Sequence, residues 1–436
     1  MKRPSFRPLL TVTAACLLPA ALHAQTTIQS PGGRLGESAA QPAGQPMATP
    51  MGPDMVVPMS PAASISQPFP PVSTSSLDGE RTGLQFRARA GAERDDNVTR
   101  VSAGQVSDTI TTVGVGLRYN QRFSQQRVVV DVDLARVDYD RLPLTYNTLN
   151  YAAAWNFRFG NRIEGIASAD RRQFRDVTNG TAGVVSRRTE RNEVLEGGYR
   201  LGAAYRVTAG VLHNQSTSTD PNSWDGNPDV TSVRVGAVYD LASGSNAAIR
   251  YRHGDGKYQT GIVPDFNDNE LEAIARWQLT AKTALDGRLA HLRREHSGGA
   301  GARNFDGLVG SIAANWEVTA KTRVIVGYAH DMGSYLLGTG GHTTSDRWYI
   351  APVWRPTVQT AVSLRYEHDN RKWVDVTGSA DAGRRDKFNV LALGVDWQVL
   401  RTVGIQAQWR NERRSSNLPA FDYRANVIGL TARLTI

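Results

Sequence analysis

The chain has 436 residues, 40% of them hydrophobic, a formal net charge of +9 at pH 7 and a single cysteine, Cys16. Beyond the N-terminal segment there is no uninterrupted apolar run of about 18 residues, which argues against a helical membrane protein. If the segment that contains Cys16 is removed, the mature chain has no disulfide, no thiolate catalysis and no cysteine metal ligand.

The N-terminus has the three parts of a secretory signal peptide. Lys2, Arg3 and Arg7 give a basic start, residues 9–22 are apolar, and a small residue, Ala24, precedes the expected cleavage point. Residues 25–80 are rich in Pro, Ser, Ala, Gln and Gly and bury too little apolar surface to offset the entropy of ordering. We therefore predict a signal peptide over 1–24, a disordered leader over 25–80 and a folded domain over 81–436.

A long strand signal is "LNYAAAWNFRFGNR", residues 149–162. Tyr151, Trp155, Phe157 and Phe159 share one parity, whereas polar and small residues occupy the other. Strict alternation indicates an extended strand whose two faces differ. The run is nearer ten residues than the five or six usual in soluble sheets, and a tilted membrane-spanning strand needs about 9–11.

The alternation recurs from Leu84 to the C-terminus, and an aromatic residue closes many segments about forty residues apart. Short connections such as "GNR" and "TAK" follow these aromatics, and longer polar ones such as "RDVTNGTAGVVSRRTER" and "GDGKYQTGIVPDFNDNE" lie between them. About nine long loops and eight short turns predict an all-β, transmembrane, antiparallel up-and-down barrel of about 18 strands. The aromatic residues concerned are Tyr119, Phe159, Tyr199, Tyr239, Trp277, Trp316, Trp354 and Trp397.

A repeat near forty residues with Trp-Asp at Trp224 is also compatible with a propeller. Each blade would need four short strands, however, whereas each repeat here holds two long alternating runs. The barrel is therefore the preferred architecture, and it explains the aromatic face, because in a bilayer that face meets lipid and its ends form an interfacial girdle.

Once the outward parity is known, the inward parity can be assigned, and it is rich in arginine. A basic wall raises the local concentration of anions in an aqueous path. The simpler alternative is that each arginine pairs with a carboxylate on a neighbouring strand and only stabilises the wall. The candidate lumen residues for a polyanion path are Arg87, Arg89, Arg118, Arg158, Arg200, Arg206, Arg234, Arg250, Arg252, Arg276, Arg288, Arg365 and Arg410.

Five histidines recur at the spacing of the repeat, but we predict no metal site for them. Histidines on alternate strands stand about 9–10 Å apart, too far to share one ion, and their parity predicts outward positions near the external interface. The Asp- and Asn-rich stretches "NSWDGNPD" and "DFNDNE" lack the calcium-loop spacing and are interpreted as solvated loops. The histidines are His213, His253, His291, His330 and His368.

None of the usual hydrolase, zinc-protease or phosphate-loop motifs occurs in the sequence. We therefore predict no enzyme activity, no catalytic residue, no cofactor and no nucleic-acid partner. A barrel can still assemble a site from distant strands, so this prediction rests on the missing motifs alone.

The stretch "GAERDDNVTR" closes the first barrel strand, and Asp95, Asp96, Asn97 and Val98 form its centre. Together with the signal peptide, the Pro-rich leader and the barrel layout, it resembles the exopolysaccharide-operon outer-membrane barrels, the EpsL-like family, which is related to β-barrel porins. Thr99 and the terminal Ile436 depart from that pattern. The resemblance implies a role in making or exporting an extracellular polysaccharide, and it supplies no catalytic residues.

The expected function is thus a basic aqueous passage for an acidic polysaccharide in the outer membrane of a Gram-negative bacterium. Its expected partners are outer-membrane lipid or lipopolysaccharide and other export components. Two alternatives stay open: a porin-like diffusion channel for small anionic solutes, and a non-conducting structural or adhesive barrel. If Arg250, Arg252 and Arg276 guide anions, their replacement by Gln should reduce anion preference.

Overall fold

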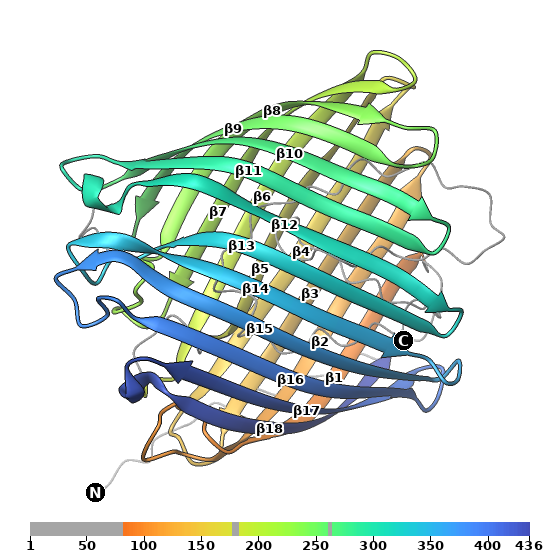
Figure 1. Ribbon diagram of the computed structural model, residues 1–436. Helices are drawn as coiled ribbons and strands as arrows, with labels where there is room; N and C mark the ends of the chain where they lie inside the picture. Colours follow the sequence, from red (N-terminus) through yellow and green to blue (C-terminus); the bar gives the residue numbers. More distant parts are fainter. Residues whose placement is uncertain (1–81, 177–182, 260–263) are drawn as a thin grey trace, which may run out of the picture.

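The computed structural model describes residues 82–176, 183–259 and 264–436, so the predicted signal peptide and leader lie outside it. In these ranges 18 antiparallel strands form one sheet in which neighbours along the chain pair and β1 also pairs with β18 (Figure 1). The closed ring leaves no strand edge unpaired, as a bilayer requires. The predicted 18-stranded barrel is confirmed, and the propeller is wrong.

The strands run up and down in chain order. Two single-turn 3₁₀ helices, η2 (Gly301–Arg303) and η3 (Pro419–Phe421), lie in the loops, and no helix in the described ranges is long and apolar enough to cross a membrane. The strands are β1 (Gly83–Asp95), β2 (Asp108–Phe123), β3 (Gln126–Tyr139), β4 (Thr145–Phe159), β5 (Ile163–Asp176), β6 (Ser186–Arg200), β7 (Tyr205–Ser218), β8 (Pro228–Asp240), β9 (Asn246–Tyr258), β10 (Phe266–Thr280), β11 (Thr283–His296), β12 (Phe305–Thr319), β13 (Thr322–Ser334), β14 (Gly340–Trp354), β15 (Thr360–Thr377), β16 (Arg385–Gln398), β17 (Val403–Ser416) and β18 (Tyr423–Thr435).

The ring closes at the C-terminus of the chain. Phe86 and Ile436 exchange two backbone hydrogen bonds, of 2.8 and 2.9 Å, and the ladder continues to Asp95 opposite Val427. Ile436 thus forms the closing ladder without the aromatic side chain expected there. Both ends of the barrel domain lie at the end of the ring that carries the short turns, on the right of Figure 1.

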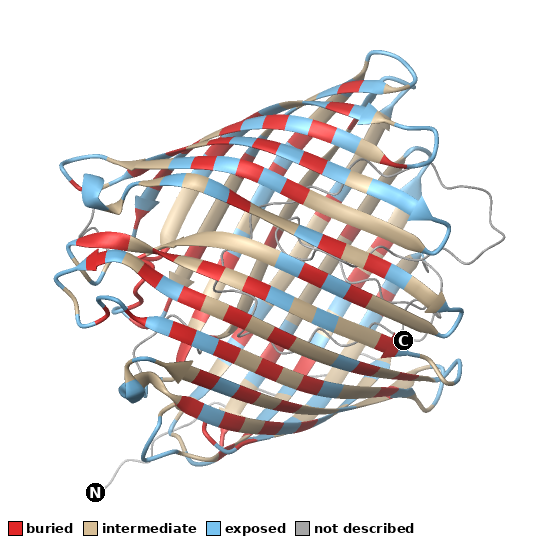
Figure 2. Cartoon of the chain, viewed as in Figure 1, coloured by how far each residue is buried: buried red, intermediate tan, exposed pale blue. Residues whose placement is uncertain are grey.

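Burial alternates along most strands, which gives the banded pattern of Figure 2, whereas parts of β5 and β13 are evenly half-buried. Outward residues such as Val113, Val115 and Leu195 are 62%, 57% and 57% exposed. Inward neighbours such as Arg118 are buried. No second layer covers the apolar outer face within the described ranges. An apolar outside around a charged inside is the arrangement of an outer-membrane barrel, and we place the protein there.

The connections differ in length between the two ends, but less than the sequence suggests. Turns at one end are as short as two residues, as at Thr280–Thr283, whereas the loop from Asp95 to Asp108 is the longest of those wholly described. Much of the polar sequence interpreted as loop is in fact strand: β5 continues to Asp176 and β10 begins at Phe266. Strands of 13–18 residues exceed the span of the apolar band, so their polar ends project beyond it.

The five histidines lie on the outer face near the long loops, as predicted, and three of them belong to a repeated clamp. In each, a Tyr-x-His pair holds one Asn or Asp on the next strand; Tyr251 and His253, for example, bond the same oxygen of Asn269 at 2.8 and 2.9 Å. Tyr328 and His330 hold Asp346, and Tyr366 and His368 hold Asn389. The polar ring atoms are thereby satisfied at the edge of the apolar band.

The lipid-facing surface can be tested at Val115, which lies between Tyr119 and the polar end of β2. A charge there meets hydrocarbon, so V115R should lower the unfolding free energy by about 2–4 kcal/mol. Phe123 is also outward but lies beyond the girdle, and F123R should cost about 0–1 kcal/mol. Urea unfolding in lipid vesicles measures both; equal costs would contradict this orientation.

Candidate functional site in the lumen

All thirteen candidate lumen arginines face inward, and each has a carboxylate oxygen within 4.0 Å. Eleven of them pair with a carboxylate on another strand, as the cross-strand alternative predicts. Arg365 and Arg410 pair instead with Glu367 and Glu412 on their own strands. The pairs are Arg87, Arg118–Asp131; Arg89–Asp133; Arg158, Arg200, Arg206–Glu164; Arg234–Glu196; Arg250–Glu272; Arg252, Arg288–Glu270; Arg276–Asp286; Arg365–Glu367; and Arg410–Glu412.

Cations exceed anions around Glu164 on β5. Arg158 and Arg200 approach its carboxylate at 2.9 and 3.0 Å, and Arg206 contacts it as well. Arg206 also reaches Asp240 at 3.2 Å. Three guanidiniums thus share two carboxylates, which leaves a net charge of +1 in this group, named here the Glu164 cluster.

The Glu164 cluster is partly open to the lumen. The side chains of Arg158 and Arg200 are 26% and 23% exposed, whereas that of Arg206 is 3% exposed. The cluster lies on β4–β7 next to the short turns, because Arg158 is opposite Glu164 and Arg200 is opposite Arg206 in the ladder. Arg158 and Arg200 can therefore meet a solute while Arg206 fixes the carboxylate.

The inward arginines of β9 and β11 are more deeply buried than Arg158 and Arg200. Glu270, only 1% exposed, accepts hydrogen bonds from Arg252 and Arg288, and Arg288 also donates to Glu272 at 2.8 Å. Arg250 is 2% exposed beside Glu272. The sequence predicts that Arg250 and Arg252 guide anions, but both side chains are buried in the wall.

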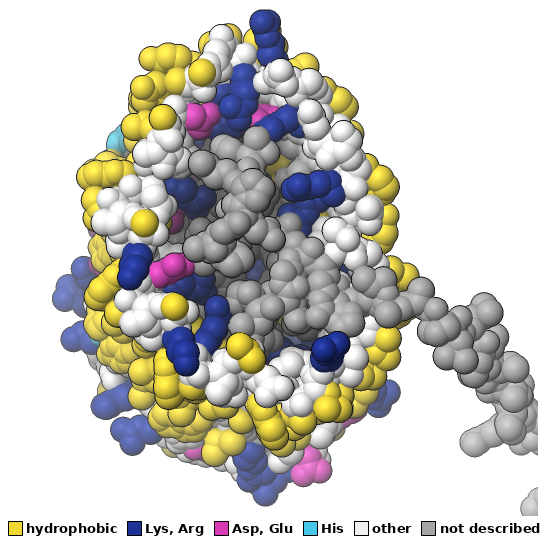
Figure 3. Space-filling model, turned by 90° about the vertical axis from the view of Figure 1, so that its right-hand side faces the viewer, with side chains coloured by type: hydrophobic (Ala, Val, Ile, Leu, Met, Phe, Trp, Pro, Cys, Tyr) yellow, Lys and Arg dark blue, Asp and Glu magenta, His cyan; other side chains and the backbone are white. Residues whose placement is uncertain are grey.

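Further basic residues surround the mouth at the short turns. Arg122 lies directly opposite Arg127, and no carboxylate in the described ranges pairs with Arg122. In the turn after β14, burial and then the nearby Arg323 lower the pKa of the Arg355 guanidinium. Figure 3, which looks into this mouth, shows dark blue side chains around the rim and on the inner wall and few magenta ones.

At the opposite end, two hairpins part from the wall and bend inward. The ladder between β4 and β5 stops at Tyr151 opposite Arg171, although β5 continues to Asp176. Beyond this point Arg175, which has outward parity, bonds the inward Asp95 of β1 at 2.7 Å. Arg187 on β6 likewise stacks on the inward ring of Tyr146, at 4.6 Å from its centroid. The end of the β5–β6 hairpin therefore packs against the inside of β1–β4.

The Asp95–Val98 stretch that carries the family resemblance forms the base for this hairpin. Asp95 is fully buried and binds both Arg100 and Arg175. The Asn97 side chain donates to two backbone carbonyls, and Val98 packs in the apolar cluster of Ile110 and Tyr139. Asp96 faces outward and accepts hydrogen bonds from Asn426. Each residue of the stretch thus has a structural contact.

The β13–β14 hairpin bends inward in the same way. The β12–β13 ladder stops at Gly310 opposite His330, although β13 continues to Ser334. Ser334 then accepts hydrogen bonds from Tyr258 and Arg294, at 2.9 and 2.7 Å, on the inner face of β9 and β11. The end of this hairpin therefore lies inside the ring.

A bridge of aromatic residues joins the β7–β8 loop to this second hairpin. The Trp224 ring lies 6.3 Å from Tyr335 and 6.2 Å from Trp373, and the Leu336 amide donates to the Trp224 carbonyl at 2.7 Å. Because β9–β12 separate the two loops in the ring, the contact crosses the lumen. The interpretation of "NSWDGNPD" as a solvated loop is wrong, since residues 223–227 are buried.

Arginines stack on aromatic rings beside this bridge. Arg371 lies 5.5 Å from the Trp224 centroid and 5.2 Å from that of Phe388, and Arg384 lies 4.2 Å from that of Trp373. Such cation–π contacts hold positive charge at the narrowed end of the lumen. Parity and motifs do not predict the roles of Arg175, Trp224, Tyr335 and Arg371. The available signal is Trp224, an aromatic residue inside a polar stretch.

Nothing in the described ranges suggests a metal centre: no group of three or more His, Cys, Asp or Glu side chains there could hold an ion. The acidic side chains of the lumen face arginines instead, as at Glu164 and Glu270.

Comparisons with known proteins concern the fold alone. No family model matches the chain, and no curated protein is similar in sequence. Among solved structures, it is similar to Pseudomonas aeruginosa OpdL (12% identity, TM-score 0.46), to P. aeruginosa OccK2 (OpdF) in complex with glucuronate (11%, 0.48) and to a BenF-like porin from Pseudomonas fluorescens Pf-5 (10%, 0.46). Each match covers 81% of this chain and 98% of the other. The chain is thus similar to outer-membrane porins in its barrel architecture.

Proposed function

We propose that this barrel is a porin-like channel for small, hydrophilic, anionic solutes. The observation that carries the proposal is the Glu164 cluster, in which two partly exposed arginines keep an excess of positive charge on the wall. A fixed charge in a narrow aqueous path enriches its counter-ion and slows ions of the same sign. The basic mouth at the short turns would act in the same direction.

The inward hairpins favour a small solute over a polymer. A polysaccharide chain needs a continuous wide lumen, whereas the Trp224–Tyr335 contact runs across the loop end. Narrowing by inward-folded loops suits a channel that selects by size and charge. The exopolysaccharide role stays a prediction of the family resemblance, and the contacts of Asp95–Val98 explain that stretch without it.

The anion preference can be tested in planar bilayers with the double variant R158Q/R200Q. A unit charge about 8 Å from the ion path changes the energy of a permeating ion by roughly 0.5 kcal/mol in water. Removal of the charges of Arg158 and Arg200 should therefore lower the anion-to-cation permeability ratio about two- to fivefold at low salt. The effect should shrink near 1 M salt, where the Debye length is about 3 Å. Reversal potentials in a salt gradient give the ratio.

The matched control is R191Q, at an outward, exposed position on β6, which should leave the ratio unchanged. An unchanged ratio in R158Q/R200Q would remove the Glu164 cluster from the conduction path. A channel that does not conduct in any variant would favour the structural or adhesive barrel.

A separate experiment addresses the polysaccharide role. If the gene for this protein is deleted, we expect exopolysaccharide to reach the medium as before. A channel for small solutes takes no part in secretion of the polymer. Retention of polymer in the periplasm, restored to secretion by the intact gene, would favour export and contradict the channel proposal.

A further inference from the structure

Five basic side chains gather on the outer face of β15–β18, at the end of the long loops. All five are exposed and outward, and they alternate with inward residues such as Asp386 and Arg414. This group, named here the basic patch, consists of Lys372, Arg385, Lys387, Arg413 and Arg424.

Among the described residues the basic patch has almost no counter-charge. Lys372 lies directly opposite Arg385, and Arg413 directly opposite Arg424. Like charges facing each other across a ladder are destabilising. The one carboxylate contact in the described ranges is Asp346, 4.0 Å from Lys372. Two other outward arginines at this end have a carboxylate partner, Arg136 with Asp138 and Arg293 with Glu295.

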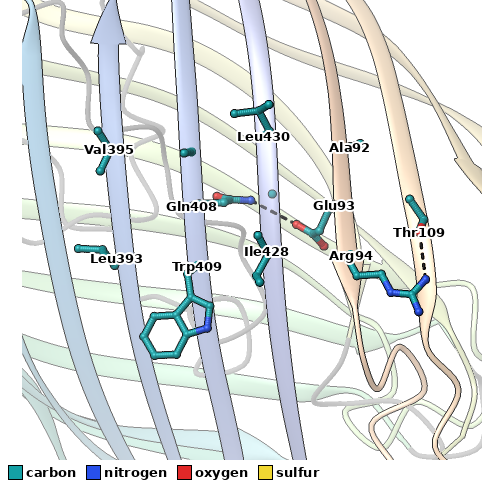
Figure 4. Close-up of a pocket in the computed structure, with 12 residues that line it drawn as sticks. Ala92, Glu93, Arg94, Thr109, Leu393, Val395, Gln408, Trp409, Ile428 and Leu430 are labelled. Carbon is teal, nitrogen blue, oxygen red and sulfur yellow. Dashed lines mark hydrogen bonds between the residues drawn. The ribbon is translucent and has the colours of Figure 1, made fainter.

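An apolar groove lies on the same outer wall, nearer the middle of the barrel. Its volume is about 490 Å³, and Figure 4 shows side chains of β16, β17 and β18 around it. Ala92 and Ala407 also line the groove, and their small side chains leave space at its base. Its apolar lining consists mainly of Leu393, Val395, Trp409, Ile428 and Leu430.

The register fixes how groove and patch are arranged. Trp409 is opposite Ile428, which is opposite Arg94, so these three mark the loop-side end of the groove. Arg413 and Arg424 lie four residues further along their strands, about 13 Å away. Asn411 and Asn426 fill the interval and bond each other, and Asp96 there accepts hydrogen bonds from Asn426.

We propose that the basic patch and the groove together bind one phosphorylated, acylated glycolipid of the leaflet on the long-loop side. Its phosphates lie against Arg413, Arg424 and Lys387, its sugar against the asparagine pair, and an acyl chain in the groove. We choose this partner because of its charge. Five cations face outward at the edge of the apolar band, and such a surface attracts anionic lipid headgroups. The proposal is independent of conduction through the lumen.

The test uses the purified full chain in detergent, titrated with a bis-phosphorylated, acylated glucosamine disaccharide and followed by native mass spectrometry. At about 1 kcal/mol per basic residue, R413Q/R424Q should weaken binding roughly tenfold or more. A second variant, A407F, fills the groove and should weaken binding of the acylated lipid but not of a short-chain analogue. Because all three positions are exposed, these variants should keep the heat-resistant folded form on electrophoresis.

R191Q/R293Q removes two outward arginines elsewhere on the ring and should bind as the wild type does. Equal binding by R413Q/R424Q and the wild type, or equal binding of a lipid without phosphate, would overturn the proposal. Competition by inorganic phosphate at the same concentration as the lipid would also overturn the proposal, because the site would then bind free phosphate.

Discussion

The W224A variant should form a channel with a larger single-channel conductance than the wild type. Trp224 is 8% exposed and holds the β7–β8 loop against Tyr335 and Trp373 across the lumen. Truncating a buried Trp to Ala typically costs about 3–5 kcal/mol. Asp225 and Ser223 still hold the loop to Arg188 on β6, and the Leu336–Trp224 backbone hydrogen bond remains toward the β13–β14 hairpin, at a typical net value of about 0.5–1.5 kcal/mol. The loop should therefore separate from the β13–β14 hairpin while the strand ladder of the barrel stays paired. Single-channel recording in planar bilayers measures the change.

W277A is the matched control for W224A. Trp277 is 56% exposed on the lipid side of β10, so its loss should leave the conductance unchanged. If W224A conducts no better than W277A, the bridge does not limit the current. If neither variant nor the wild type conducts, the lumen is closed at another place and the non-conducting barrel gains support.

The outer face of this barrel can be predicted from sequence because it depends on two local properties of each strand. Side chains alternate with a period of two residues, and the lipid requires one parity to be apolar, so Val113 and Val115 can be assigned from their own segment. The number of strands then follows from counting alternating segments. The strand ends could not be predicted in this way, since the polar stretch into which β10 extends has the composition of a loop.

The candidate site depends on register and on distant contacts, which composition does not reveal. That Arg158, Arg200 and Arg206 face inward is evident from parity, but that they share Glu164 follows only from the ladder between β4 and β7. Arg175 is a harder case. Its parity assigns it to lipid, and only the parting of β4 from β5 turns it toward Asp95.

Glu270 should be among the most sensitive positions for the stability of the barrel. E270Q keeps the shape of the side chain but removes the charge that Arg252 and Arg288 share, and all three residues are buried. Breaking a buried ion pair from one side typically costs about 3–5 kcal/mol, because the remaining charge has no compensation. The free energy of unfolding, measured in urea with lipid vesicles, should fall by that amount.

E295Q removes the same charge from an exposed pair, Arg293–Glu295, whose side chains are 57% and 46% exposed. Its cost should stay below about 1 kcal/mol, since water screens such pairs. A small cost for E270Q as well would mean that Glu272 and Asp268 neutralise the two arginines by themselves. The arginines of β9–β11 would then resemble those of the Glu164 cluster, and R250Q/R252Q should lower the anion preference of the channel.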